Sequence, residues 1–294
     1  MELLINDLSK SYPGGVHALK KVSLTIPAGM FGLLGPNGAG KSTLMRTLAT
    51  LQEADSGSAT LDGIDVLRQK DQVRRLLGYL PQEFGLYPKV TASELLGHFA
   101  VLKGVAPAKR RRELVDALLR KTNLYDVRDE RLGTFSGGMK QRFGIAQALI
   151  GDPKLIIVDE PTAGLDPEER VRFHNLLSEI GEQIVVILST HIVGDVSDLC
   201  RRMAVIDHGE VVLTGEPLAL IAELRGRIWR RFAAKEELAE LKTRHAVIST
   251  RRLAGKTVIH VDSDARPDES FEPVEPDLED VYFRAIKHHS APSA

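Results

Sequence analysis

The chain has 294 residues, of which 43% are hydrophobic and 27% charged, and its formal net charge is -1. This composition is typical of a soluble globular protein, and the length allows about two domains of ~150 residues each. The near-zero charge gives no indication of nucleic-acid binding, and the single cysteine excludes an internal disulfide. No apolar run approaches the ~18 residues of a membrane helix and no signal peptide is evident, so we expect a chain that neither spans a membrane nor is secreted by that route.

The N-terminal stretch predicts two β-strands joined by a turn. Apolar residues at 3–5 and 22–26 favour strands, and Pro13, Gly14 and Gly15 between them favour a turn. Tyr12 stands at that turn. Its ring either packs on the surface or offers a flat platform on which a base can stack, and the residues here leave both interpretations open.

A glycine-rich loop follows the apolar residues 30–34 and precedes a run of helix-forming residues. Its spacing, G-x-x-x-x-G-K-S, is that of the Walker A phosphate loop. Glycines let successive backbone N–H groups curl around a phosphate, and a helix that starts near Lys41 adds the positive end of its dipole. Lys41 would reach the β- and γ-phosphates of a nucleotide, and Ser42 would offer a hydroxyl to Mg²⁺. The predicted nucleotide-binding loop comprises Gly35, Pro36, Asn37, Gly38, Ala39, Gly40, Lys41, Ser42 and Thr43.

Two further strands are expected at 58–61 and 76–80, and the second ends at Pro81 and Gln82. A loop glutamine is usually only solvated. Because Gln82 follows a buried-looking strand, its side-chain oxygen could also serve as a ligand for Mg²⁺.

Residues from about 91 to 150 predict a helical insertion in an α/β domain. Apolar residues recur at helical spacing after residue 91, a second helix is expected at 109–119, and Ser136, Gly137 and Gly138 open a third. The basic run 109–112 is interpreted as a solvated helix face, with contact to lipid headgroups as the less favoured alternative.

A buried strand with two acidic residues at its end is expected next. The continuous apolar run at 155–158 is typical of a parallel strand that is covered on both faces. It ends in Asp159 and Glu160. Placing carboxylates at the end of a buried strand costs free energy, so such residues are expected to have a binding or catalytic role. Ligands bind at this end of open α/β sheets, so Asp159 could hold Mg²⁺ and Glu160 could polarise an attacking water.

A turn at 163–167, a helix at 168–180 and a buried strand at 184–188 follow. That strand leads to His191, at the same end of the sheet as the phosphate loop. A lone histidine is more often structural than catalytic, but at this place it could hydrogen-bond a γ-phosphate. Strands at 204–206 and 211–213 then form a hairpin.

The remainder of the chain carries no further phosphate chemistry. Helices are expected at 216–224 and 278–286, and strands at 246–249 and 257–261. The stretch 262–280 is acidic and contains Pro267, Pro273 and Pro276, a composition typical of a linker. We therefore expect one domain at 1–222, with its helical subdomain at about 91–150, and a small α+β extension at 223–294.

Taken together, the motifs resemble those of the ATP-binding cassette (ABC) ATPases over about residues 3–215. The resemblance rests on the phosphate loop, Gln82 as the Q-loop glutamine, the signature sequence 135–139, the Walker B strand with Glu160, the D-loop around Asp166 and the switch histidine His191. Tyr12 matches the position of the aromatic residue that stacks on adenine in this family.

The signature departs from the common form at both ends. It most often reads Leu-Ser-Gly-Gly-Gln in the family and reads Phe-Ser-Gly-Gly-Met here. Ser136 and Gly138, which face the γ-phosphate in the family, are retained, whereas Met139 offers no side-chain amide.

The resemblance implies an α/β, P-loop NTPase core with a mostly parallel sheet, an antiparallel N-terminal β region and a helical insertion. It implies ATP hydrolysis with Mg²⁺ as cofactor. The roles it implies are catalysis for Lys41, Glu160 and His191; metal binding for Ser42, Gln82 and Asp159; and nucleotide contact for Tyr12, the phosphate loop, Gln82, Ser136, Gly137, Gly138 and Asp166.

The family also implies partners. Its cassettes pair head to tail, and we expect the second ATPase subunit to be another copy of this chain. A separate transmembrane permease would hold the protein at the cytoplasmic face of the cell membrane, and residues 278–282 are similar to the tails of exporter ATPases. No nucleic-acid partner is expected.

Alternatives in other classes are weaker. A soluble ABC ATPase of iron–sulfur cluster assembly is the hardest to exclude. DNA-repair members carry coiled-coil insertions, translation-type members carry two cassettes, and a P-loop kinase is disfavoured by the signature and by Glu160 beside Asp159.

Overall fold

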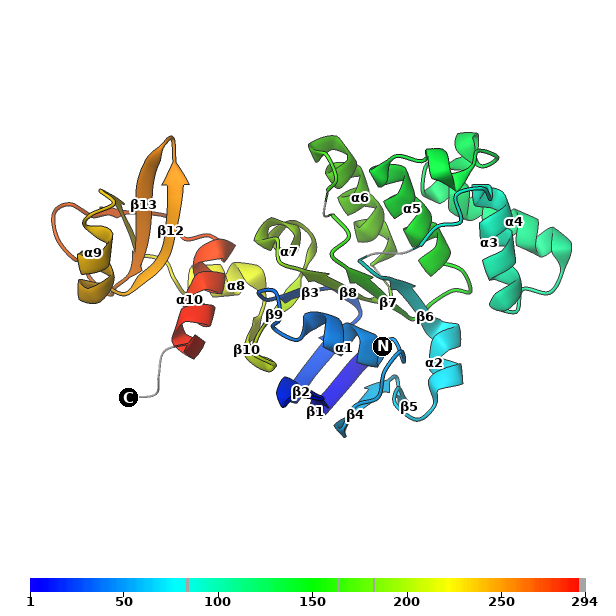
Figure 1. Ribbon diagram of the computed structural model, residues 1–294, viewed down its shortest axis with the longest axis horizontal. Coiled ribbons are helices and arrows are strands. Elements are labelled where there is room, and N and C mark those ends of the chain that lie inside the picture. The colour runs from blue at the N-terminus through cyan, green and yellow to red at the C-terminus, as the bar shows by residue number, and fades with distance from the viewer. Residues whose placement is uncertain (83–84, 163, 182, 291–294) are drawn as a thin grey trace.

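The structure is a computed structural model that describes residues 1–82, 85–162, 164–181 and 183–290. Over these residues the strands form sheets of four, six and four members. In Figure 1 the central sheet runs across the molecule, with helices above it, the N-terminal strands below it and the C-terminal strands at the far left.

The central sheet has the strand order β10-β9-β3-β8-β7-β6. Its strands are β3 (Gly29–Leu34), β6 (Leu77–Leu80), β7 (Leu155–Asp159), β8 (Val185–Thr190), β9 (Arg202–Asp207) and β10 (Glu210–Gly215). All neighbours pair in parallel except β9 and β10, which form an antiparallel hairpin at one edge. This confirms the mostly parallel sheet, and it brings the carboxyl ends of β3, β6, β7 and β8 to one side, where ligands bind in such sheets.

The central sheet is buried on both faces because alternate residues of a strand point to opposite sides. Ile157 joins a core formed with α1 (Lys41–Leu48) and the N-terminal strands. Ile156 and Val158 join a second core with α6 (Pro167–Ile180) and α7 (Val193–Leu199). The two cores explain why the residues of this strand form a continuous apolar run.

The N-terminal antiparallel sheet has the order β2-β1-β4-β5. Its strands are β1 (Glu2–Tyr12), β2 (Val16–Pro27), β4 (Ser56–Leu61) and β5 (Ile64–Asp65). The first two are much longer than the expected 3–5 and 22–26, because the inward-facing Leu8 and Leu19 continue the buried face toward the turn at 13–15. The predicted turn is confirmed.

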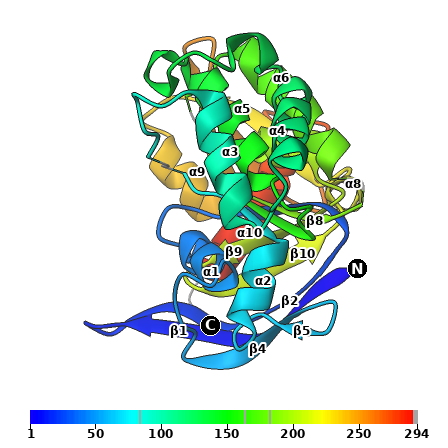
Figure 2. The same ribbon diagram turned by 90° about the vertical axis from the view of Figure 1, so that its right-hand side faces the viewer.

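The helical insertion is confirmed, and it has its own apolar core, which includes Leu96 and Phe143. Figure 2 views the molecule from this side, with α3 and α4 toward the viewer. Its helices are α3 (Ala92–Leu102), α4 (Ala108–Lys121) and α5 (Gly137–Ala148), with short 3-10 turns at Tyr125–Val127 and Leu132–Thr134; α2 (Lys70–Leu76) precedes it. Thr91 and Glu94 form a capping box that starts α3, as the sequence suggested.

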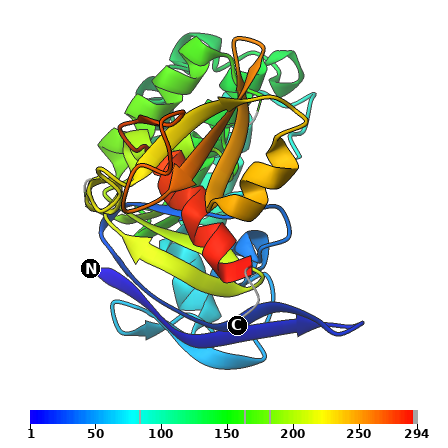
Figure 3. The same ribbon diagram turned by 90° about the vertical axis from the view of Figure 1, so that its left-hand side faces the viewer.

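The C-terminal region contains more structure than the sequence indicated. Its elements are α8 (Pro217–Ala222), β11 (Ile228–Ala233), α9 (Leu238–Arg244), β12 (Val247–Leu253), β13 (Lys256–Asp262), β14 (Glu272–Pro273) and α10 (Leu278–Ser290). The linker interpretation of 262–280 is wrong, because β14 pairs with β11 and Phe271 is fully buried under the sheet. β11 itself was not foreseen. Helix α10 contacts β12 of the C-terminal sheet and also α7, α8, β9 and β10. It therefore links the C-terminal strands to the edge of the central sheet, and Figure 3 shows it in front of both.

Among the described ranges, no helix combines the length and hydropathy needed to cross a membrane.

Candidate functional site

A cleft of about 690 Å³ lies at the carboxyl ends of the central strands. Such a volume suits a small-molecule ligand. The structure brings together here most of the residues that the sequence singled out. The lining residues are Tyr12, Val16, His17, Ala18, Lys20, Pro36, Asn37, Gly38, Ala39, Gly40, Lys41, Ser42, Thr43, Gln82, Glu160, His191 and His208.

The glycine-rich loop runs from the end of β3 directly into α1, as its spacing predicts. Gly40 has a φ of 107°, and a Cβ added there would lie 2.3 Å from the carbonyl oxygen of Ala18. A side chain at Gly40 is therefore excluded both by the backbone conformation and by space. The N-terminus of α1 consequently opens into the cleft with its unpaired N–H groups, an arrangement that favours an anion.

The side chain of Lys41 is buried beside this loop. Its Nζ donates to the carbonyl oxygen of Gly35 at 2.6 Å and to that of Pro36 at 3.2 Å, and it lies 3.8 Å from Oε1 of Glu160. Burial lowers the pKa of Lys41, and the charges of Glu160 and Asp159 oppose that shift. The side chain is thus held in the cleft by two backbone carbonyl oxygens, with Glu160 as its ion-pair partner.

Glu160 is placed between Lys41 and His191. Its Oε2 accepts a hydrogen bond from Nδ1 of His191 at 2.7 Å, while Oε1 faces Lys41. The residue has a φ of 50°, in the left-handed region, and its N–H donates to the carbonyl oxygen of Ser189 at 2.8 Å. A non-glycine residue in this conformation is strained, and such strain is concentrated at functional sites.

Asp159 supplies a carboxylate oxygen suited to a metal. Its side chain is buried, yet Oδ1 has no hydrogen-bond partner among the described residues. Buried polar atoms are normally satisfied, so this carboxylate oxygen is suited to bind a cation such as Mg²⁺. Ser42 and Gln82, the other predicted metal ligands, are both among the residues that line the cleft.

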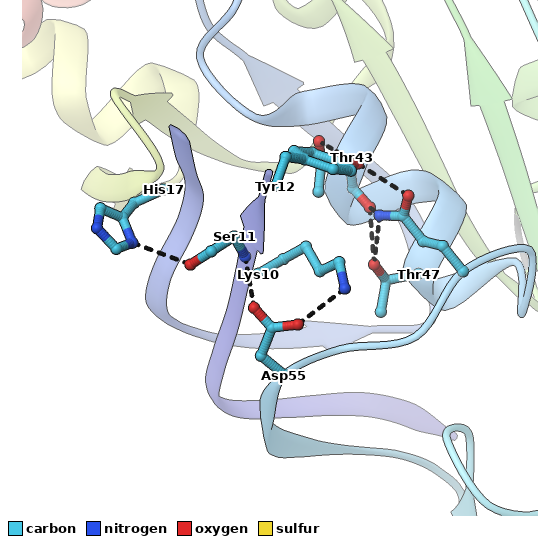
Figure 4. A network of polar contacts seen from close by, with 8 residues as sticks. Lys10, Ser11, Tyr12, His17, Thr43, Thr47 and Asp55 are labelled. Carbon is cyan, nitrogen blue, oxygen red and sulfur yellow. Dashed lines mark hydrogen bonds and ion pairs between the residues drawn. The ribbon is translucent and has the colours of Figure 1, made fainter. Parts of the chain in front are cut away.

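Tyr12 lies where the tip of the β1–β2 hairpin meets the phosphate loop (Figure 4). Its hydroxyl donates to Oε1 of Gln52 at 2.9 Å and lies 3.4 Å from Oγ1 of Thr43. Gln52 in turn donates to the carbonyl oxygen of Thr43 and to Oγ1 of Thr47, both at 2.9 Å. The hydroxyl is thus anchored to the phosphate-loop helix, and Tyr12 as a whole remains 36% exposed.

Asp55 holds the hairpin tip that carries Tyr12. It accepts a hydrogen bond from Nζ of Lys10 at 2.8 Å and one from the backbone N–H of Ser11 at 2.6 Å. Figure 4 shows these contacts beneath the tyrosine. Gln52 and Asp55 were not identified from the sequence, because no local pattern marks a contact with a residue some 40 positions away.

The signature residues and Asp166 do not line the cleft. Ser136 caps α5 by accepting a hydrogen bond from the N–H of Met139 at 3.1 Å, and Gly137 follows it. Asp166 caps α6 in the same way. A Cβ at Gly138 would lie 2.4 Å from Oε2 of Glu169, so this glycine lets α5 approach α6 closely. A single chain therefore does not unite its signature with its own phosphate loop.

Residues 19–163 match the family described as ABC transporter. The chain is 34% identical to the linearmycin resistance ATP-binding protein LnrL of Bacillus subtilis over 226 residues, which cover 76% of this chain and 72% of LnrL. This chain belongs to the ABC transporter ATP-binding family. It is also 36% identical to the probable multidrug ABC transporter ATP-binding protein YbhF of Escherichia coli over 274 residues, or 91% of this chain. The matched region spans only 47% of YbhF.

The fold of this ABC family member matches that of solved cassettes. The dimeric, post-hydrolysis structure of the ATP-binding cassette MJ0796 with ADP and Pi gives a TM-score of 0.67 at 27% identity, covering 73% of this chain and 98% of that one. The expected P-loop NTPase fold and family are thereby confirmed.

Proposed function

We propose that this protein is the ATP-hydrolysing nucleotide-binding subunit of an ABC exporter. The observation that carries the proposal is the position of Glu160, whose two carboxylate oxygens face Lys41 and His191 in the nucleotide cleft. A carboxylate in this place can orient and polarise a water for in-line attack on a γ-phosphate.

Each residue of the site has a distinct role in this proposal. The N–H groups of the loop and of the first turn of α1 bind phosphate oxygens, and Lys41 neutralises charge on the β- and γ-phosphates. Glu160 is the general base. His191 fixes the rotamer of Glu160 through Nδ1 and lines the same cleft, where it would hydrogen-bond the γ-phosphate. Tyr12 offers its exposed ring to the adenine.

Mg²⁺ is proposed as the cofactor, held by Ser42, Gln82 and Asp159. The unpartnered, buried Oδ1 of Asp159 supports this assignment. When bound, the ion would neutralise charge on the phosphate oxygens.

The working unit is proposed to be a head-to-tail dimer of this chain. Ser136, Gly137, Gly138 and Asp166 would complete the partner's nucleotide site, since they lie outside the cleft of their own chain. The dimeric state of the MJ0796 cassette supports this arrangement.

Export through a separate transmembrane permease, with the protein at the cytoplasmic face of the membrane, is also a proposal. It is supported by the relatives, which are described as a multidrug transporter ATP-binding protein and a linearmycin resistance ATP-binding protein. We assign the ATPase domain to 1–222 and the C-terminal extension to 223–294.

Glu160→Gln tests the proposed hydrolysis. The amide keeps the shape of the side chain and removes the base, so MgATP should bind within about twofold of wild type while turnover falls by about 10²–10⁴. Retained ATP should also hold the dimer closed, which size-exclusion chromatography with and without ATP measures. Glu168→Gln, an exposed carboxylate on α6, is the matched control and should hydrolyse ATP at the wild-type rate. Near-normal turnover by Glu160→Gln would remove Glu160 from the role of base, and a wild-type protein without ATPase activity would overturn the function itself.

A further inference from the structure

Asp195 of α7 is a buried carboxylate that touches neither the cleft nor the solvent. Its side chain is 0% exposed. Oδ1 accepts hydrogen bonds from Nε of Arg170 at 2.8 Å and from Nε2 of His174 at 2.9 Å. Oδ2 accepts from Oγ1 of Thr162 at 2.5 Å and from Oγ1 of Thr190 at 3.4 Å. Nη2 of Arg170 also lies 2.7 Å from Oδ1, so donors from four side chains surround this carboxylate and fill its lone-pair positions.

The two threonines flank the hydrolytic pair in the sequence. Thr162 follows Glu160 by two residues, and Thr190 immediately precedes His191. One oxygen of Asp195 therefore joins the segment that leaves β7 to the end of β8, next to the place where Glu160 contacts His191.

Glu160 needs such support because its backbone is strained. A left-handed φ at a non-glycine residue persists only where the surrounding structure holds it. The N–H of Glu160 is tied to Ser189 on one side, and the bond from Thr162 to Asp195 fixes the chain two residues further on. Together these bonds anchor the general base on both sides.

Asp195 is itself rigidly mounted. Val196, the next residue, packs so closely on β3 that a Cβ at Gly32 would lie 2.6 Å from Cγ1 of Val196. Arg170 and His174 fix the carboxylate to α6. Burial alone would raise the pKa of Asp195, but the hydrogen bonds from His174 and Thr162 and the charge of Arg170 outweigh it and lower the pKa, which keeps the carboxylate ionised.

We propose that Asp195 is a positioning residue for hydrolysis, which holds Glu160 and His191 in register through Thr162 and Thr190. The inference rests on the proposed ATP hydrolysis by Glu160. Small displacements of a base relative to the attacked phosphate reduce rate far more than they reduce ground-state binding. Loss of the Thr162–Asp195 bond should therefore lower kcat and leave nucleotide affinity unchanged.

Thr162→Val and Thr162→Ser test this in the full-length protein. Valine keeps the shape and removes the hydroxyl, and we expect kcat to fall at least about tenfold with the Kd for MgATP within about twofold of wild type. Serine keeps the hydroxyl and should restore kcat to near wild type. A purely structural contact would instead lower thermal stability and nucleotide affinity together, without this split between kcat and Kd.

Asp195→Asn and Asp198→Asn provide the second comparison. Asparagine at 195 turns its NH₂ toward one pair of donors, so kcat should fall as in Thr162→Val, and adding Thr162→Val should cause little further loss. Asp198 lies on the same helix with its side chain 64% exposed, and among the described residues it makes a polar contact with neither threonine, only with Nδ1 of His174 at 3.8 Å. Asp198→Asn should therefore keep the wild-type kcat. If wild type hydrolyses ATP and either Thr162→Val or Asp195→Asn folds with a kcat within about twofold of it, the positioning role is wrong. If wild type does not hydrolyse ATP, the proposed function fails first.

Discussion

Lys41 lies in buried surroundings that disfavour the protonated form of its side chain. Burial lowers its pKa in the free protein from 10.5, against the opposing effect of Glu160 and Asp159. ATP phosphates add negative charge beside Nζ and raise that pKa again. At a pH between the pKa of Lys41 in the free protein and its pKa in the ATP complex, the free lysine is partly deprotonated and the bound lysine is protonated. ATP binding should therefore take up a proton from the buffer. At a pH well below the pKa of Lys41 in the free protein, this proton uptake should vanish.

Calorimetric titration with MgATP at alkaline pH, in two buffers with different ionisation enthalpies, measures the proton uptake. ATP itself is fully deprotonated there. Lys41→Arg, whose guanidinium stays charged, should bind without uptake at saturating ATP. Equal binding heats for wild type in both buffers would contradict the predicted change in protonation.

The residues of the phosphate cleft could be predicted from the sequence because each lies in a local pattern. Lys41 is fixed by loop spacing, and Glu160 and His191 each follow a buried strand. Gln52 and Asp195 could not be predicted in this way. Gln52 contacts Tyr12, 40 positions away, and Asp195 contacts Thr162, 33 positions away. Only the packed fold brings these residues together.

Among the elements, α10 has a larger structural role than its terminal position suggests. Its Leu278 and Val281 are buried and belong to the core between the central sheet and the helices α6 and α7. The C-terminal strands were harder to predict. The arginines of β11 interrupt its apolar pattern, and the acidic, proline-rich stretch around Phe271 reads as a linker until its long-range pairing is known.

Val281→Asp tests whether α10 supports the ATPase domain. A carboxylate placed in this apolar contact is expected to cost several kcal/mol, because it loses hydration without gaining a partner. The melting temperature of the whole chain should fall, and the midpoint measured with bound nucleotide should fall with it. Phe283→Asp, at a position 39% exposed on the same helix, is the matched control and should change the midpoint far less. Equal midpoints for Val281→Asp and wild type would show that α10 does not stabilise the ATPase domain.

At the scale of the whole molecule, the residues assigned to hydrolysis lie in two separate places. The phosphate loop, Glu160 and His191 gather at the carboxyl ends of the strands, whereas Ser136 caps α5 outside that cleft. In a two-fold head-to-tail pair, one site would use Lys41 of the first chain and Ser136 of the second, and the other site the reverse. This arrangement can be tested without a structure of the dimer.

Mixing two inactive variants should restore activity if sites are shared. A Lys41→Ala homodimer has two broken sites, and so has a Ser136→Arg homodimer. A mixed dimer gathers both lesions in one site and leaves the other whole. Random pairing makes about half the dimers mixed, so ATPase activity should recover to at most about a quarter of wild type if the sites act independently.

The control for this mixture is a single chain that carries both Lys41→Ala and Ser136→Arg, paired with wild type. Each site of that dimer carries one lesion if sites are shared, because each lesion falls in a different site. The mixed dimer should therefore be inactive, and with random pairing this mixture should keep only about a quarter of wild-type activity, from the wild-type homodimers it contains. If each chain instead used its own Ser136, the doubly changed chain would leave its wild-type partner with one whole site, and this mixture would keep about half of wild-type activity. The mixture of single variants would then hydrolyse nothing. The two mixtures together therefore decide whether the signature of one chain serves the nucleotide of the other.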